Sequence, residues 1–175
     1  MKEIKENLVN VRLGLVFTFA TLGLGLFLGV VFGAFEDDIK DVLHARAMTA
    51  YHNVYFDDMG EVDRVVEKSW EYFKRAHYHS YAIGTITLIL VFLISIFNRK
   101  KVANILSLVL AISSFGYSVY WLWAGIKAPI LGSTTLAKES LSWFAMPMAG
   151  IYGLCSMIVF LIVIITLYKN KFKKN

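Results

Sequence analysis

Apolar residues form four long runs along this chain, and short polar segments separate the runs. They cover about residues 13–35, 78–97, 102–124 and 141–168. Each run is close to, or longer than, the ~20 residues that an α-helix needs to cross the hydrocarbon core of a bilayer. The pattern predicts an all-α integral membrane protein, in which four transmembrane helices form a bundle within a single membrane domain.

The polar segment between the first two runs, residues 36–77, also has a helical pattern. It contains no proline, and apolar or aromatic residues recur at spacings of three and four through its second half. A break is expected at residues 56–60, where Gly60 can turn the chain. We therefore expect the first two transmembrane helices to extend beyond the membrane as an extracytoplasmic helical hairpin. The alternative is a pair of amphipathic helices that lie along the membrane interface.

Composition supports the membrane class. Hydrophobic residues make up 57% of the 175 residues, which is more than a soluble domain of this size carries. The first run is longer than the apolar core of a signal peptide, and no typical cleavage site follows it, so we expect it to be retained. The only cysteine, Cys155, excludes an internal disulfide or a thiol redox pair, and its expected role is packing.

Basic residues gather in three short segments, and the net charge is +5. By the positive-inside rule, residues 1–12, 98–101 and 169–175 are cytoplasmic, and the hairpin and the outer loop 125–140 lie on the other side. This predicts a multi-pass protein of the cytoplasmic (inner) membrane with both termini in the cytoplasm. The basic ends are expected to contact anionic lipid. Nucleic acid is not an expected partner, because no folded basic face would bind it.

Three glycines, Gly25, Gly29 and Gly33, recur at a spacing of four in the first run. Such a stripe lets the backbone of another helix approach closely. The favoured interpretation is packing within the bundle, and the alternative is a contact between copies in a homo-oligomer.

All four histidines of the chain, His44, His52, His77 and His79, lie between the end of the first apolar run and the first residues of the second. If the hairpin turns near residues 57–58, His77 and His79 lie opposite Ile39 and Asp37 on the first helix. Asp38, Asp41 and His44 then lie within about a turn of the two histidines. The outer end of the bundle would bring imidazole and carboxylate groups together.

Imidazole with carboxylate is a ligand set that suits Fe, Cu, Zn or Mn. Glu139, in the second outer loop, could close such a site from above. The candidate metal ligands are therefore His44, His77, His79, Asp38, Asp41 and Glu139, and His52 is a further candidate for cofactor binding.

The spacing of His77 and His79 limits what they can bind. In a regular helix the two side chains point roughly 200° apart and cannot ligate one ion, whereas a broken backbone would let both bind. If the helix is regular, only one of them is expected to face the bundle, while the other faces lipid headgroups or a neighbouring subunit. A second scheme is haem b, held by one histidine from each long helix, such as His44 with His77 or His79. A third is that no cofactor binds and the rings are interface anchors.

The sequence names no reaction. It contains no phosphate-binding loop, nucleophile elbow or zinc-protease motif, and its apolar runs contain no Asp, Glu, Lys or Arg that could serve an ion pathway. The leading hypothesis is a small membrane redox or metal-binding protein that exchanges electrons with quinol or a periplasmic carrier at the outer face. If it is an enzyme, the expected class is a membrane oxidoreductase. The alternative is a non-catalytic subunit or assembly factor of a larger membrane complex.

Overall fold

A computed structural model describes residues 2–97 and 100–172, and these form six helices and no strand. The helices are α1 (Lys2–Asn10), α2 (Arg12–Met48), α3 (Met59–Phe97), α4 (Lys100–Leu131), α5 (Thr134–Ser140) and α6 (Ser142–Phe172). Within the described chain, α2, α3, α4 and α6 are long and apolar enough to cross a membrane. The predicted all-helical class and its four apolar helices are confirmed. The expected cytoplasmic segments 98–101 and 169–175 fall partly outside the described residues.

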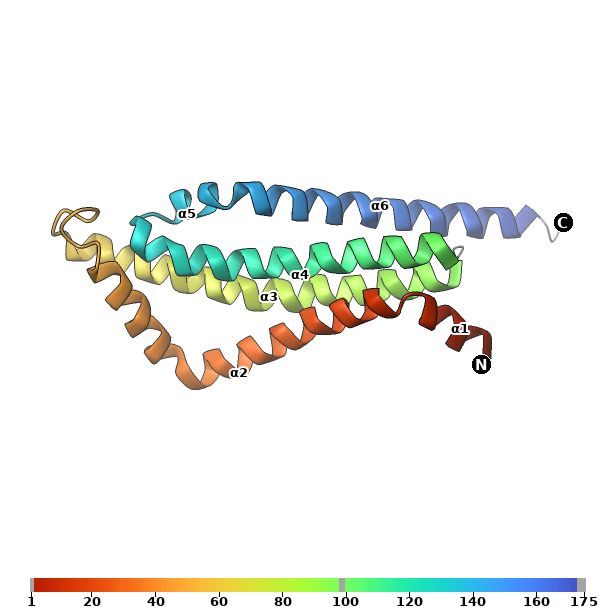
Figure 1. The fold of residues 1–175 in the computed structure, drawn as a ribbon, viewed down its shortest axis with the longest axis horizontal. Helices are drawn as coiled ribbons and strands as arrows, with labels where there is room; N and C mark the ends of the chain where they lie inside the picture. The colour runs from red at the N-terminus through yellow and green to blue at the C-terminus, as the bar shows by residue number, and fades with distance from the viewer. Residues whose placement is uncertain (1, 98–99, 173–175) are drawn as a thin grey trace.

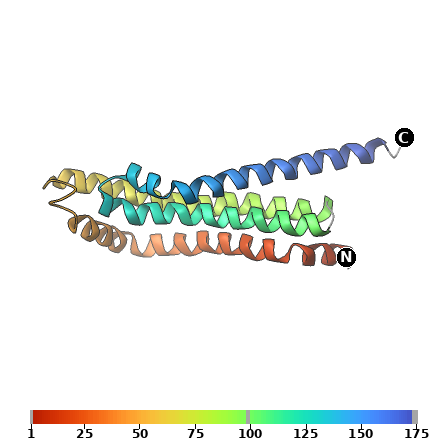
Figure 2. The same cartoon turned by 45° about the horizontal axis from the view of Figure 1, so that its top comes forward.

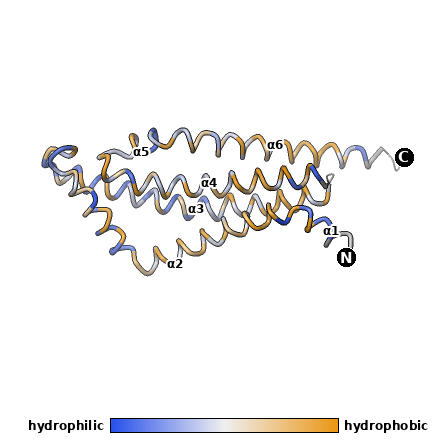
Figure 3. The backbone as a smooth tube through the Cα atoms, in the orientation of Figure 1, coloured by the Kyte–Doolittle hydropathy of each residue, from blue (hydrophilic) through white to orange (hydrophobic). Residues whose placement is uncertain are grey.

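The helices α2, α3 and α4 pack against one another, and α6 packs mainly on α4, on the side away from α2 (Figure 1). Both ends of the chain lie at one end of the molecule, and residues 49–58, which connect α2 to α3, lie at the other. Apolar residues fill the middle of the long helices, and hydrophilic residues gather toward their ends (Figure 3). In Figure 2 the C-terminal end of α6 diverges from the other helices, although Val159 in its middle is still fully buried against them.

The helix α2 bends at Phe35, whose backbone angles of φ −134° and ψ 30° are not helical. The bend points away from α3 and α4, and the outer part of α2 then returns toward them (Figure 1). This return buries Leu43 and Ala47, which are 2% and 0% exposed. The bend therefore falls where the predicted transmembrane run ends and the acidic outer segment begins.

Residues 49–58 connect α2 to α3 and determine how the two helices pair. Phe56 and Asp57 turn the chain with positive φ angles of 51° and 64°, whereas Gly60 lies inside α3. The chain therefore turns within the predicted break, but α2 already ends at Met48, so the connection is longer than predicted and His77 packs against Gly29 of α2 instead of Ile39. The predicted pairing is wrong by about ten residues, or ~15 Å along the helix.

This connection is attached to the end of α4. The buried Tyr55 hydroxyl donates a hydrogen bond of 2.6 Å to the carbonyl oxygen of Pro129, one of the last carbonyls of α4 that no helical N–H can reach. Burial raises the pKa of Tyr55 to about 12. Gly132 ends α4 with a φ of +63°, and the Val54 side chain fills the space that a Cβ would need. Glycine is thus required there both for its conformation and for its size.

The glycine stripe packs mostly inside the molecule, which agrees with the favoured interpretation of packing within the bundle. A Cβ on Gly25 would lie 3.1 Å from side-chain atoms of Ser80 and Tyr81, and a Cβ on Gly29 would lie 2.7 Å from the His77 ring. Gly33, by contrast, has open space around it. Two of the three glycines therefore serve the contact between α2 and α3.

Candidate functional site

His77 lies between α3 and α2, in the space that Gly25 and Gly29 leave. Its Nδ1 is 2.9 Å from the carbonyl oxygen of Gly25. Phe32 and Tyr81 stand edge-on to the imidazole, at ring-centre distances of 6.3 and 5.2 Å. The histidine is therefore half-buried at the contact between two of the long apolar helices.

His79 lies on the opposite face of α3, because α3 is a regular helix at this point. Its ring packs against Tyr117 and Trp121 of α4, each at a ring-centre distance of 5.5 Å. The expectation that one of the two histidines faces lipid or another subunit is therefore wrong. α3 packs against both α2 and α4, so the His77 side and the His79 side of it each meet a neighbouring helix.

Both rings use the same nitrogen for hydrogen bonding. His79 Nδ1 lies 2.8 Å from the carbonyl oxygen of Arg75, and His77 Nδ1 contacts that of Gly25. A carbonyl oxygen only accepts, so each Nδ1 carries the proton and donates it. In the neutral ring, Nε2 then holds the free lone pair.

The other two histidines have acidic partners elsewhere. His44 Nε2 lies 3.7 Å from an Asp63 carboxylate oxygen on α3, and His52 Nδ1 lies 2.5 Å from Asp57 within the connection. Asp63 is fourteen residues from His77 on the same helix, which corresponds to ~21 Å. The structure therefore does not bring His44 or His52 to the pair at His77 and His79, as a single metal ion or haem iron would need.

The predicted carboxylate ligands are also dispersed. Asp38 and Asp41 lie exposed on α2 beyond the bend at Phe35, and Glu139 lies exposed on the short helix α5. Across residues 2–97 and 100–172, no group of three or more His, Cys, Asp or Glu side chains is placed to hold a metal ion. The predicted ligands thus occupy several places instead of one.

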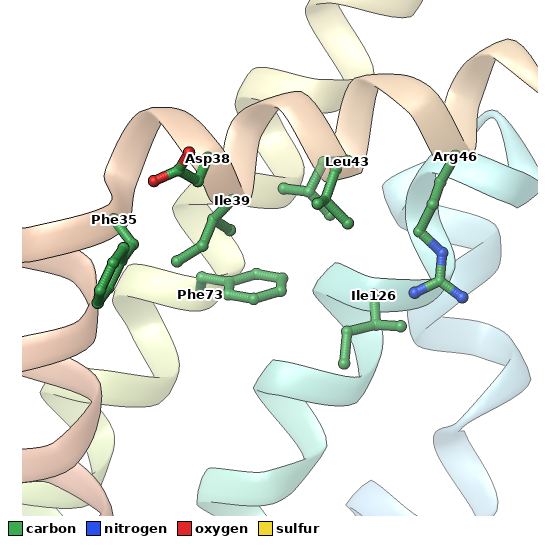
Figure 4. A pocket seen from close by; sticks show the side chains of 8 residues that line it. Phe35, Asp38, Ile39, Leu43, Arg46, Phe73 and Ile126 are labelled. Carbon is green, nitrogen blue, oxygen red and sulfur yellow. The ribbon is translucent and has the colours of Figure 1, made fainter.

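Beneath the bend in α2 is an apolar cavity of about 620 Å³, a volume typical of small-molecule sites. Figure 4 shows Ile39 and Leu43 of α2 above it, Phe73 of α3 behind it and Ile126 of α4 below it. Asp38 and Arg46 lie toward opposite ends. Phe32 and Phe73, with ring centres 5.9 Å apart, stand together on the side of the cavity toward His77.

The sequence interpretation did not include this cavity. The sequence did indicate which residues share this face of α2, because helical spacing along its outer part relates Phe35, Ile39, Val42 and Arg46. What the spacing cannot show is the bend at Phe35, which points away from α3 and α4 and leaves space beneath the part of α2 that returns toward them.

Comparison of the chain with protein-family models, with curated proteins and with solved structures finds no match. The functional argument therefore rests on the geometry of this molecule.

Proposed function

We propose that the protein is a non-catalytic subunit or assembly factor of a larger membrane complex, and that its partner covers α6. One observation carries this proposal. In the most apolar eighteen-residue stretch of α6, only 11% of the residues are buried, against 28% in α2, 39% in α3 and 50% in α4. A partner helix laid along α6 would give it burial like that of the other three.

The placement in the membrane is part of the same proposal. α2 and α3 have 37 and 39 residues, which at 1.5 Å per residue makes each about twice as long as the ~30 Å hydrocarbon core is thick. Their outer parts, residues 36–77, then extend beyond the bilayer as the extracytoplasmic hairpin. The positive-inside rule places both termini in the cytoplasm of a cell whose inner membrane holds the protein.

The experiment compares glycines that have open space around them. Nothing lies within 4 Å of a Cβ at Gly150 or Gly153 on α6, or at Gly23 on α2, and all three positions are exposed, so a leucine side chain at each begins in open space. The tagged protein is extracted from membranes with a mild detergent and its assembly is measured on native gels. We expect Gly150→Leu and Gly153→Leu to remove most of the high-mass assembly, and the control Gly23→Leu to retain it.

Two results would overturn the proposal. One is a wild-type protein that migrates as a monomer even when it is extracted with its surrounding lipid. The other is an assembly that survives both α6 variants unchanged, because lipid alone then covers this helix. An assembly that contains only copies of this chain would replace the proposed partner with a homo-oligomer.

A second candidate, a redox or metal-binding protein, is favoured by the hydrogen bonds of His77 and His79. Histidines that ligate metals commonly donate the other ring N–H to a backbone carbonyl, which fixes the ring and its free nitrogen. Because the two rings lie on opposite faces of α3, each would need ligands from elsewhere. The cofactor would be Fe, Cu, Zn or haem b. Quinol would enter the cavity beneath the bend, and a periplasmic electron carrier is the other exchange partner.

Absorption spectra of the oxidised and dithionite-reduced protein, with metal analysis of the same sample, test this candidate. Haem gives a Soret band and α and β bands that sharpen on reduction. We expect His77→Ala to abolish retention of the cofactor and His52→Ala, in the exposed connection, to leave it unchanged. A metal-free preparation with a featureless visible spectrum, or full retention in His77→Ala, would count against it.

A further inference from the structure

A second cavity lies at the end of the molecule that carries both termini. It has a volume of about 450 Å³, and it lies where the junction of α1 and α2 meets the start of α4. Its lining consists of Val9, Asn10, Arg12, Leu13, Lys101 and Asn104. Two cations and two amides thus face one space, beside two apolar side chains.

The packing of α2 on α4 explains why this cavity exists. At Gly14 the two helices touch so closely that a Cβ would lie 2.7 Å from the Ser107 side chain. One turn nearer the end, the chain leaves the helix at Val11, which is fully buried, and continues as α1. The cavity opens just beyond this tight contact, with Arg12 on one side and Lys101 on the other.

The charge of the cavity is unbalanced. Among the side chains that the structure describes, which exclude those of residues 2–5 and 97–100, no carboxylate forms an ion pair with Arg12 or Lys101. α2 also begins here without a side-chain cap, so its partial positive charge adds to that of the two cations. An anion with several oxygen acceptors matches this set of donors.

The apolar part of the lining narrows the choice of anion. Val9 and Leu13 are 61% and 46% exposed beside the two cations, and Ile105 on α4 is 56% exposed next to Asn104. A ligand whose phosphate binds the cations and whose hydrocarbon lies along α2 and α4 would satisfy both parts. Basic pockets between membrane helices bind the headgroups of anionic lipids in this way.

We propose that this cavity is a binding site for a phosphate group, and that the group belongs to an anionic phospholipid of the adjacent leaflet. Arg12 and Lys101 bind the phosphate, the amides of Asn10 and Asn104 complete the set of donors, and one acyl chain lies against Leu13. The site is distinct from the four histidines and from the cavity beneath the bend, and it does not depend on the proposed partner of α6.

Native mass spectrometry of the full-length protein in detergent tests this site. The protein is titrated with short-chain phosphatidylglycerol, with phosphatidylcholine of the same chain length, and with inorganic phosphate. We expect phosphatidylglycerol to bind preferentially, and the double variant Arg12→Gln/Lys101→Gln to bind it about thirtyfold more weakly. The control Lys169→Gln/Lys171→Gln removes the same charge from α6 and should bind as the wild type does.

The titrations with the two lipids and with phosphate distinguish a lipid site from the alternatives. Competition by inorganic phosphate at similar concentrations supports the phosphate site but assigns it to a free phosphate instead of a lipid. Equal binding of the two lipids would overturn the proposal, and so would equal weakening by the α6 control, because the effect would then be general surface charge. The side chains of Arg12 and Lys101 are both exposed, so the fold should tolerate the double variant. Circular dichroism of the variants checks that the helices are retained.

Discussion

His77 and two glycines of α2 form one packing unit at the contact between α2 and α3. The imidazole occupies the space that Gly25 and Gly29 leave, and its hydrogen bond to the Gly25 carbonyl satisfies a polar ring inside the molecule. A side chain at Gly29 would lie 2.7 Å from His77 Cε1, which is too close. This arrangement gives the histidine a structural role even if it binds no cofactor.

A double-mutant cycle tests that unit. Gly29→Ala is expected to destabilise the protein by about 1–3 kcal/mol, because the methyl group and the imidazole overlap. In a His77→Ala background the same change should cost little, so the two effects are not additive. Thermal unfolding in detergent measures all four proteins. Gly33→Ala, where the structure leaves open space, is the control. Additive effects would show that the ring and the glycine do not pack as described.

At the scale of elements, the connection between α2 and α3 sets limits on what the sequence could predict. The helices themselves were predictable, because long apolar runs without interruption have few other stable structures in a membrane. Their pairing was not, because residues 49–55 contain neither proline nor glycine and yet leave the helix. A long-range hydrogen bond from Tyr55 to Pro129 holds this turn, together with local ones such as that of Tyr51 to Asp57. The histidine site was predicted from that pairing, so its members were placed together when the structure separates them.

Tyr55 offers a direct test of how the connection is attached to α4. Tyr55→Phe leaves the Pro129 carbonyl without its partner and should cost about 1–3 kcal/mol of stability. Tyr51→Phe is a matched control, because the Tyr51 hydroxyl also donates to a backbone carbonyl, that of Asp57, but at an exposed position. We expect the control to cost less than Tyr55→Phe, as measured by thermal unfolding in the same detergent. Equal costs would contradict the attachment.

The raised pKa of Tyr55 predicts how the stability of the protein changes with pH. Burial favours the neutral phenol, so the folded state has a pKa of about 12, above the ~10 of an unfolded chain. Its contribution to stability is complete below pH ~10 and is lost as the pH rises through the folded-state pKa. Between pH ~10 and ~12, wild type should therefore lose more stability than Tyr55→Phe. Parallel pH profiles of the two proteins would contradict the burial of this hydroxyl.

At the scale of the whole molecule, the sequence predicted four apolar helices but not their unequal burial. α2, α3 and α4 share the interior, whereas α6 is apolar on all sides and meets the others along one face. Hydrophobic periodicity cannot distinguish lipid from a partner helix, since both are apolar. Only the packing shows that α6 is the exposed member, and it is this asymmetry that favours a subunit of a larger complex over a self-contained enzyme.

Orientation in the membrane is the last property that follows from the arrangement, and labelling can test it. Cys155 is the only cysteine and is buried between α6 and the other helices, so Cys155→Ala gives a background without thiols. Asn53→Cys, in the exposed connection, should react with a membrane-impermeant maleimide in intact spheroplasts. Lys169→Cys, near the end of α6, should react only after the membrane is opened. The reverse pattern would place the histidine-bearing segment in the cytoplasm and remove the periplasmic electron carrier from consideration, because the two compartments do not mix.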